Sequence, residues 1–166
     1  MIIETKIKGF TIRFAEEKDT GLILKFIKGL AEYEKLSHEV VATEDILWES
    51  IFKQNAAEVI IGEYNNKPVG FALFFHNFST FLGRSGLYLE DLFIIPEMRG
   101  KGFGKTMLAF LAKLAVDRNY GRFEWWCLDW NKPSVEFYKG IGAVPMEEWT
   151  TFRLTGNELQ DLAREF

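Results

Sequence analysis

The sequence predicts an α/β protein built on one mixed β-sheet with helices flanking it. Apolar runs typical of strands alternate with amphipathic runs typical of helices, after an apparent antiparallel hairpin in the first half of the chain. The chain has 166 residues and an apolar fraction of 48%, which is enough to fill one hydrophobic core. We therefore expect a single domain over residues 1–166.

Local patterns place each element in chain order. Residues 10–14 alternate like an edge strand, and Asp19 can cap a helix from 20 to about 35 whose apolar residues share one face. The Asn65-Asn66 pair predicts the turn of a hairpin. Pro133 suits the first turn of a short helix that ends near Gly140. The other expected elements are helix 43–53, strands 57–64 and 68–76, strand 86–95, helix 106–119, strand 122–128, strand 150–154 and helix 157–164.

The most informative segment is the glycine-rich run 99–105, Arg-Gly-Lys-Gly-Phe-Gly-Lys, between a predicted buried strand and a predicted helix. Glycines at alternate positions leave the backbone uncovered, and the first turn of a helix has unpaired N–H groups. Exposed amides and the positive end of a helix bind phosphate. Arg99, Lys101 and Lys105 add cationic charge, so the loop predicts a site for a phosphorylated cofactor.

The spacing of the glycines excludes two common phosphate loops. A nucleoside-triphosphate P-loop needs glycine at position 99, where this chain has Arg, and a dinucleotide loop needs glycine at 105, where it has Lys. The pattern that fits is Arg-x-x-Gly-x-Gly, formed by Arg99, Gly102 and Gly104. It resembles the pyrophosphate-binding motif of the GNAT superfamily of N-acetyltransferases. The local alternative is a surface turn that caps a helix.

Further segments extend this resemblance from about residue 11 to 162, giving an expected domain core of about 10–162. They are Leu-Ala-Glu-Tyr-Glu at 30–34, Tyr-Leu-Glu-Asp at 88–91 and Trp-Asn-Lys-Pro-Ser-Val-Glu-Phe-Tyr-Lys at 130–139. Together they resemble the branch of spermidine/spermine and thialysine N-acetyltransferases. The resemblance implies the GNAT fold, in which the parallel strands 88–95 and 123–128 would splay apart to admit acetyl-CoA. It also implies a homodimer.

Amine acetylation needs a polarised thioester carbonyl, an amine that loses a proton and a thiolate that gains one. The resemblance implies that Tyr138 is the general acid and that Glu90 binds the amine and relays its proton through water. From the residues alone, Tyr138 could simply pack beside Phe137, and Glu90 could pair with Arg99. Because successive side chains of a strand point to opposite faces, we expect Glu90 and Asp91 to lie on opposite faces, so that one can face the active site while the other meets a different environment.

The resemblance also implies residues that bind the cofactor and the substrate. The expected acetyl-CoA contacts are Leu92, Phe93, Ile94, Arg99, Gly100, Lys101, Gly102, Phe103, Gly104, Lys105, Glu124, Trp125, Trp126, Asn131, Lys132, Pro133 and Ser134. The expected substrate contacts are Tyr33, Glu34, Glu90 and Glu148. Glu147-Glu148-Trp149 lacks a glycine that the family has in this segment, so which Glu contacts the substrate stays open. From the residues alone, Tyr33 and Glu34 could equally be part of an acidic, solvated helix end.

Composition and charge exclude several other classes of function. The net charge of −4 argues against nucleic-acid binding and favours cationic ligands. We expect no metal, because His38 and His76 have no metal-ligand spacing. The single cysteine, Cys127, favours a reducing compartment. The absence of an apolar signal-like or membrane-spanning run predicts a cytoplasmic protein without membrane contact.

These patterns predict an N-acetyltransferase that moves the acetyl group of acetyl-CoA directly to a primary amine. The leading expected substrates are polyamines or diamines such as spermidine or spermine. The alternative within the class is a thialysine-like or lysine-like amine, because the cation-binding residues would be much the same. The alternative of another class is a non-catalytic module that binds acyl-CoA.

Overall fold

The computed structural model describes residues 1–166, which divide into two compact units, Met1–Trp126 and Cys127–Phe166. The first unit contains the strands β1 Ile2–Glu4, β2 Phe10–Phe14, β3 Glu58–Tyr64, β4 Lys67–Ser79, β5 Arg84–Ile94 and β6 Phe123–Trp125. Its helices are η1 Glu17–Asp19, α1 Thr20–Glu34, η2 Ser37–Glu39, α2 Glu44–Trp48, η3 Glu49–Lys53, η4 Pro96–Met98 and α3 Phe103–Asp117. The second unit contains α4 Lys132–Gly140 and α5 Gly156–Ala163.

The first unit is built on one six-stranded sheet of order β1-β2-β3-β4-β5-β6. Neighbouring strands are antiparallel from β1 to β5, and β6 runs parallel to β5. The predicted mixed sheet is therefore confirmed. The prediction that residues 10–14 form an edge strand is wrong, because Ile2–Glu4 pairs with β2 and itself forms the edge.

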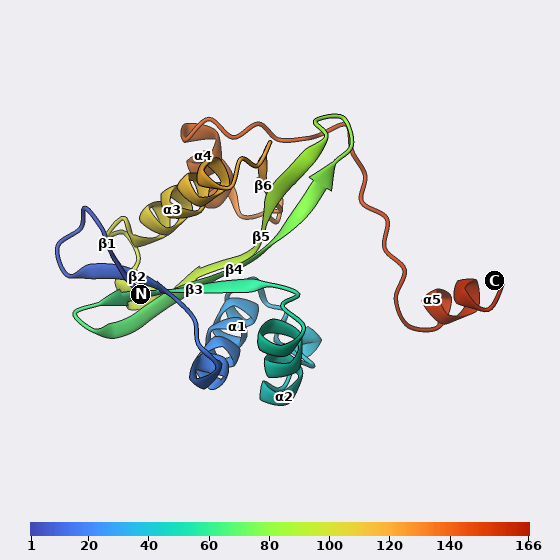
Figure 1. Ribbon diagram of the computed structural model, residues 1–166, viewed down its shortest axis with the longest axis horizontal. Helices are drawn as coiled ribbons and strands as arrows, with labels where there is room; N and C mark the ends of the chain where they lie inside the picture. The colour runs from blue at the N-terminus through green and yellow to red at the C-terminus, as the bar shows by residue number, and fades with distance from the viewer. The chain divides into compact units, whose positions relative to one another are not determined.

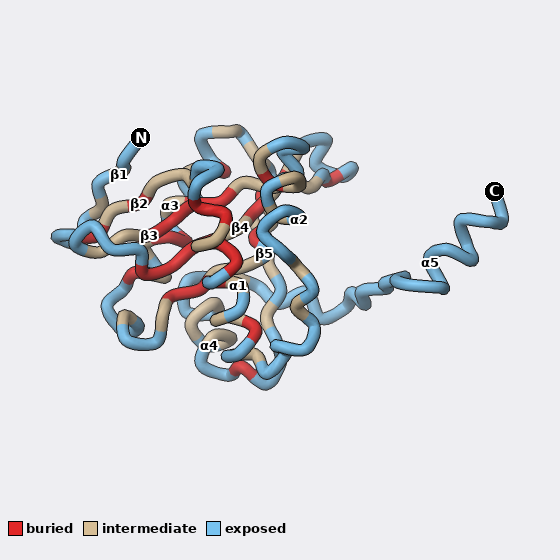
Figure 2. Tube along the Cα trace, turned by 90° about the horizontal axis from the view of Figure 1, so that it is seen from below, coloured by how far each residue is buried: buried red, intermediate tan, exposed pale blue.

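Helices cover both faces of this sheet (Figure 1), with α1 and α2 on one face and α3 on the other. On the α1 face, Phe26 stacks on Phe71 with ring centroids 5.5 Å apart. On the α3 face, Phe103 stacks on Phe10 at 4.2 Å, and both rings are fully buried. Figure 2 shows the buried residues concentrated along the central strands. Stacked aromatic pairs thus anchor a helix to each face.

The β3–β4 hairpin and α2 follow local rules that the sequence displays. Asn65 and Asn66 have φ angles of 50° and 61°, as a two-residue type I′ turn requires. The Thr43 hydroxyl accepts a hydrogen bond from the Ile46 N–H at 3.3 Å and caps α2. The predicted helix 43–53 is confirmed in extent, although its second half, Glu49–Lys53, is π-helical.

Helix α3 begins at Phe103, earlier than the predicted start at Thr106. Gly102 precedes it with a φ of 82°, a left-handed conformation that glycine adopts without steric cost. The buried Phe103 ring then fixes the first turn against β2. The second half of the glycine-rich segment is therefore part of the helix itself.

The parallel strands β5 and β6 separate partway along their length. Their pairing runs only from Leu87 opposite Phe123 to Leu89 opposite Trp125, while β5 continues to Ile94. β6 is thus shorter than the predicted strand 122–128. An unpaired edge of β5 results, as the splay implied by the family resemblance requires.

The second unit contains two short helices and extended segments. α4 and α5 form within about one residue of the predicted helices. The predicted strand at 150–154 is wrong, because these residues are exposed and form no ladder. A strand needs a neighbour to bond its backbone groups, and no segment of this unit pairs with residues 150–154.

Candidate active site

The glycine-rich segment forms a cradle of free backbone amides at the start of α3. Gly100 and Gly102 have φ angles of 76° and 82°. The Thr106 N–H bonds to the Gly102 carbonyl at 2.9 Å, which leaves the N–H groups of Phe103, Gly104 and Lys105 without helical partners. A side chain at Gly100 would meet no atom within 4 Å, so the loop is open on that side. This arrangement fits a pyrophosphate group.

The three cations of the segment have different surroundings. Arg99 donates from Nε to the Ile94 carbonyl at 2.9 Å, and its guanidinium lies 4.6 Å from the Tyr33 ring centroid. It is therefore directed to the end of β5 and to α1, and the alternative in which it pairs with Glu90 is not observed. The Lys101 ammonium lies 5.9 Å from the Tyr64 ring, and Lys105 is exposed. Both lysines can approach a bound anion.

The unpaired edge of β5 presents backbone groups beside this cradle. The Ile95 N–H donates to the Val69 carbonyl of β4 at 2.9 Å. Because alternate amides of a strand point the same way, the Phe93 N–H also faces β4, and those of Leu92 and Ile94 face the open edge. Of the three amides expected to contact the cofactor arm, Leu92 and Ile94 are thus the available donors. We call this edge, together with residues 99–105, the donor cradle.

A β-bulge interrupts β5 at Glu90. Leu73 of β4 lies opposite Asp91 and Phe74 lies opposite Leu89, so Glu90 has no residue opposite it. Such an extra residue disturbs the strict alternation of side chains. As a result, Glu90 and Asp91 line the same pocket, and the expected separation of the two side chains onto opposite faces is wrong.

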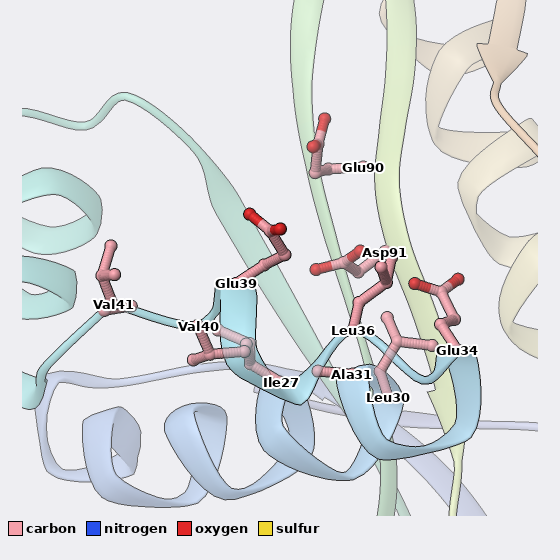
Figure 3. A pocket seen from close by; sticks show the side chains of 11 residues that line it. Ile27, Leu30, Ala31, Glu34, Leu36, Glu39, Val40, Val41, Glu90 and Asp91 are labelled. Carbon is pink, nitrogen blue, oxygen red and sulfur yellow. The ribbon is translucent and has the colours of Figure 1, made fainter. Parts of the chain in front are cut away.

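The pocket has a volume of about 390 Å³ and lies on the α1 face of the sheet (Figure 3). Its acidic lining consists of Glu34, Glu39, Glu90 and Asp91. Its apolar lining consists of Ile27, Leu30, Ala31, Leu36, Val40, Val41 and Ala42. Figure 3 shows the carboxyl groups above the apolar side chains of Ile27, Leu30 and Ala31, which α1 contributes. We call this cavity the acceptor pocket.

The electrostatics of the acceptor pocket favour a cation. No Lys, Arg or His lines it. Burial, together with repulsion from Glu90 and Glu34, raises the pKa of the Asp91 carboxyl to about 6. Burial also raises the pKa of Glu34. An ammonium group would offset this unfavourable charge, while the apolar wall suits an alkyl chain.

The structure brings together Glu34 and Glu90 of the four expected substrate residues. Tyr33 does not line the pocket, and its ring lies under the Arg99 guanidinium. Sequence reasoning assigned no substrate role to Asp91 or Glu39. The substrate role of Asp91 was missed because no residue pattern in the sequence predicts the bulge. That of Glu39 was missed because Glu39 resembles the other solvated acidic residues near the end of α1.

The expected contacts on β6 lie where the two parallel strands part. Glu124 accepts a hydrogen bond from Asn77 Nδ2 at 2.8 Å and pairs with Arg122 Nε at 2.7 Å. The Trp125 ring lies 4.9 Å from that of Phe123. The Trp126 ring packs edge-on against Tyr88 at 6.1 Å. Glu124 is thus occupied by protein partners, and its proposed contact with acetyl-CoA would involve the backbone.

The remaining expected residues belong to the second unit. Asn131 is buried at the start of α4, with Lys132 and Pro133 in the first turn, followed by Ser134. The Asn131 side chain makes no capping hydrogen bond to α4. Tyr138 is half-buried on the same helix, with its ring 5.4 Å from Phe137. Glu148 is exposed outside regular structure. The roles of these residues stay predictions.

Comparisons with known proteins agree with this geometry. The model of the acetyltransferase (GNAT) family matches residues 27–143. The chain belongs to this family. It is therefore a GNAT N-acetyltransferase, and family membership implies acetyl-CoA as the acetyl donor. The cradle described above has the free amides and open glycines that such a donor needs.

Two curated relatives and one solved structure show how far the similarity extends. The chain is 38% identical to thialysine N-epsilon-acetyltransferase of Sus scrofa, with 92% of this chain and 96% of the relative covered. It is 33% identical to L-ornithine N5-acetyltransferase NATA1 of Arabidopsis thaliana, with coverages of 90% and 86%. An integron cassette protein of V. cholerae superposes with a TM-score of 0.79 at 28% identity, covering 95% of this chain and 99% of that one.

No helix of the protein has both the length and the apolar character needed to cross a membrane.

Proposed function

We propose that the protein acetylates the side-chain amine of a small amino acid of the thialysine or ornithine type. The acidic acceptor pocket supports a substrate with an alkylammonium group, because it combines four carboxylates with an apolar wall. The names of two near full-length relatives support an amino-acid substrate over the polyamines that the sequence patterns favoured. The proposed substrate is therefore the thialysine-like or lysine-like amine that was the alternative in the sequence analysis.

The chain's own residues supply the steps of this reaction. The free amides of Phe103, Gly104 and Lys105 would hold the donor's pyrophosphate, and the edge of β5 would bond its amide arm as an added strand does. Carboxylates of the acceptor pocket would hold the incoming ammonium. We retain Tyr138 as the proposed acid that protonates the departing thiolate, since a phenol with a pKa of about 10 stays protonated at neutral pH.

A diamine or polyamine is the second candidate, and one observation favours it. The acceptor pocket has no cationic side chain that would pair with the carboxylate of an amino acid. An amino acid therefore has to keep its carboxylate outside the acidic lining, whereas a diamine carries no such group.

Matched substrate pairs distinguish the two candidates. Ornithine and putrescine differ only in the carboxylate, as do lysine and cadaverine. We would measure kcat/KM for each from the release of free thiol from acetyl-CoA, and include thialysine and spermidine. The proposal expects a kcat/KM at least about tenfold higher for the amino acid of each pair, equivalent to about 1.4 kcal/mol.

A preference of that size for the diamines would instead establish the second candidate. If none of these amines is acetylated although acetyl-CoA binds, both candidates would fail, and a non-catalytic acyl-CoA module or another amine would become the better explanation.

A further inference from the structure

Two adjacent carboxylates line the acceptor pocket, and their surroundings differ. The bulge at Glu90 leaves Glu90 and Asp91 on one cavity wall, where a regular strand would separate them. Glu90 is exposed, whereas Asp91 is partly buried between the sheet and α1. The exposed carboxylate is suited to meeting a cation from solvent, and the inner one lies further from water.

We propose that Asp91 is the residue that takes the proton from the bound ammonium group, while Glu90 holds the cation. This inference rests on the proposed function, and it departs from the expectation that Glu90 relays the proton. The two residues then divide binding and proton transfer between them.

The proton balance of the proposed step is complete. The Asp91 carboxylate takes one proton from the ammonium group, which yields a neutral amine and a carboxylic acid. The nitrogen lone pair forms the C–N bond to the acetyl carbon, and the C–S bond breaks with its electron pair on sulfur. A second proton lost from nitrogen balances the one that the thiolate gains. Asp91 returns its proton to solvent, so each turnover releases one proton.

Burial and the charged groups around Asp91 make it a better base than an ordinary aspartate. Glu90 on β5 and Glu34 on α1 both repel its negative charge, and Glu39 on η2 lines the same cavity. His38 pairs with the Glu39 carboxylate at 3.2 Å, and the Arg99 guanidinium lies over the Tyr33 ring. A rise in the carboxyl pKa from 3.8 to about 6 makes proton transfer from an ammonium roughly a hundredfold less unfavourable.

The test compares the pH dependence of wild type, Asp91→Asn, Asp91→Glu and Glu90→Gln. As pH is lowered, the wild-type kcat/KM for the amine should decrease with the titration of one group near pH 6. We call this decrease the acid limb of the pH profile. In Asp91→Asn, kcat at saturating amine should fall by about a hundredfold or more, and this acid limb should disappear. Asp91→Glu should restore the limb. Glu90→Gln should raise KM for the amine and keep the limb, but move it to lower pH because Glu90 contributes to the raised pKa of Asp91.

Two results would overturn the inference while leaving the proposed function intact. One is a kcat and an acid limb in Asp91→Asn that match wild type. The other is loss of the limb in Glu90→Gln alone. A wild type that acetylates no amine would overturn both proposals. Thermal unfolding and acetyl-CoA binding of each variant establish that a lost activity does not reflect a lost fold.

Discussion

The donor cradle and the acceptor pocket are built by opposite means. The cradle uses backbone: free amides at the start of α3, glycines of positive φ and an unpaired edge of β5. The pocket uses side chains from α1, the loop after it and β5. Backbone donors suit a pyrophosphate that is the same in every reaction, whereas side chains can change with the amine. Variants in the two regions should therefore affect different kinetic constants.

The largest effect on a KM is expected from Gly102→Ala in the donor cradle. The φ of 82° is left-handed, and an L-residue there costs about 1–2 kcal/mol. Because Gly102 precedes the free amides of α3, the strain should displace them and raise KM for acetyl-CoA about tenfold or more. KM for the amine should change little.

Gly83→Ala is the matched control for that variant. Gly83 also has a positive φ, 64°, with no atom within 4 Å of an added Cβ, and it lies in the turn between β4 and β5. It should lose similar stability without a change in KM. Equal effects of both substitutions on KM would contradict the assignment of the cradle.

A smaller effect is expected from Glu34→Gln in the acceptor pocket. Removing one of four carboxylates should raise KM for the amine about three- to tenfold and leave KM for acetyl-CoA unchanged. Because Glu34 contributes to the raised pKa of Asp91, the acid limb of kcat/KM should also move to lower pH. Glu32→Gln changes a nearby exposed residue outside the pocket lining and should leave both constants as they are.

The smallest effect is expected on the stability of the Asp91→Asn variant, which changes a residue of the acceptor pocket. Asp91 has a higher pKa in the folded chain than its ordinary 3.8, so its ionisation opposes folding. This cost develops as pH rises from about 4 to 6 and is complete above that range. Asp91→Asn should therefore raise Tm by a few degrees at pH 8, and the gain should vanish near pH 4. A gain independent of pH would show that charge is not its cause.

Sequence patterns predicted the open glycine-rich loop in detail and the lining of the acceptor pocket only in part. Spacing in residues 99–105 specifies where glycine, and hence exposed backbone, must occur. The Asn65-Asn66 turn is likewise a local conformational requirement. Glu34 and Glu90 were expected in the site, but the pocket also contains Asp91 and Glu39. The expected strand at 150–154 did not form, because alternation alone does not supply the neighbour that a strand needs.

The sequence by itself determined the family, the mixed sheet and the open glycine-rich loop, because each depends on local conformational preference or on short motifs. Tertiary structure alone decided that Glu90 and Asp91 share one wall of a pocket with Glu34 and Glu39. That decision depends on the register of β5 against β4, where a single extra residue redirects a side chain. The raised pKa of Asp91 follows from the same packing, because burial and neighbouring charge exist only once the chain has folded.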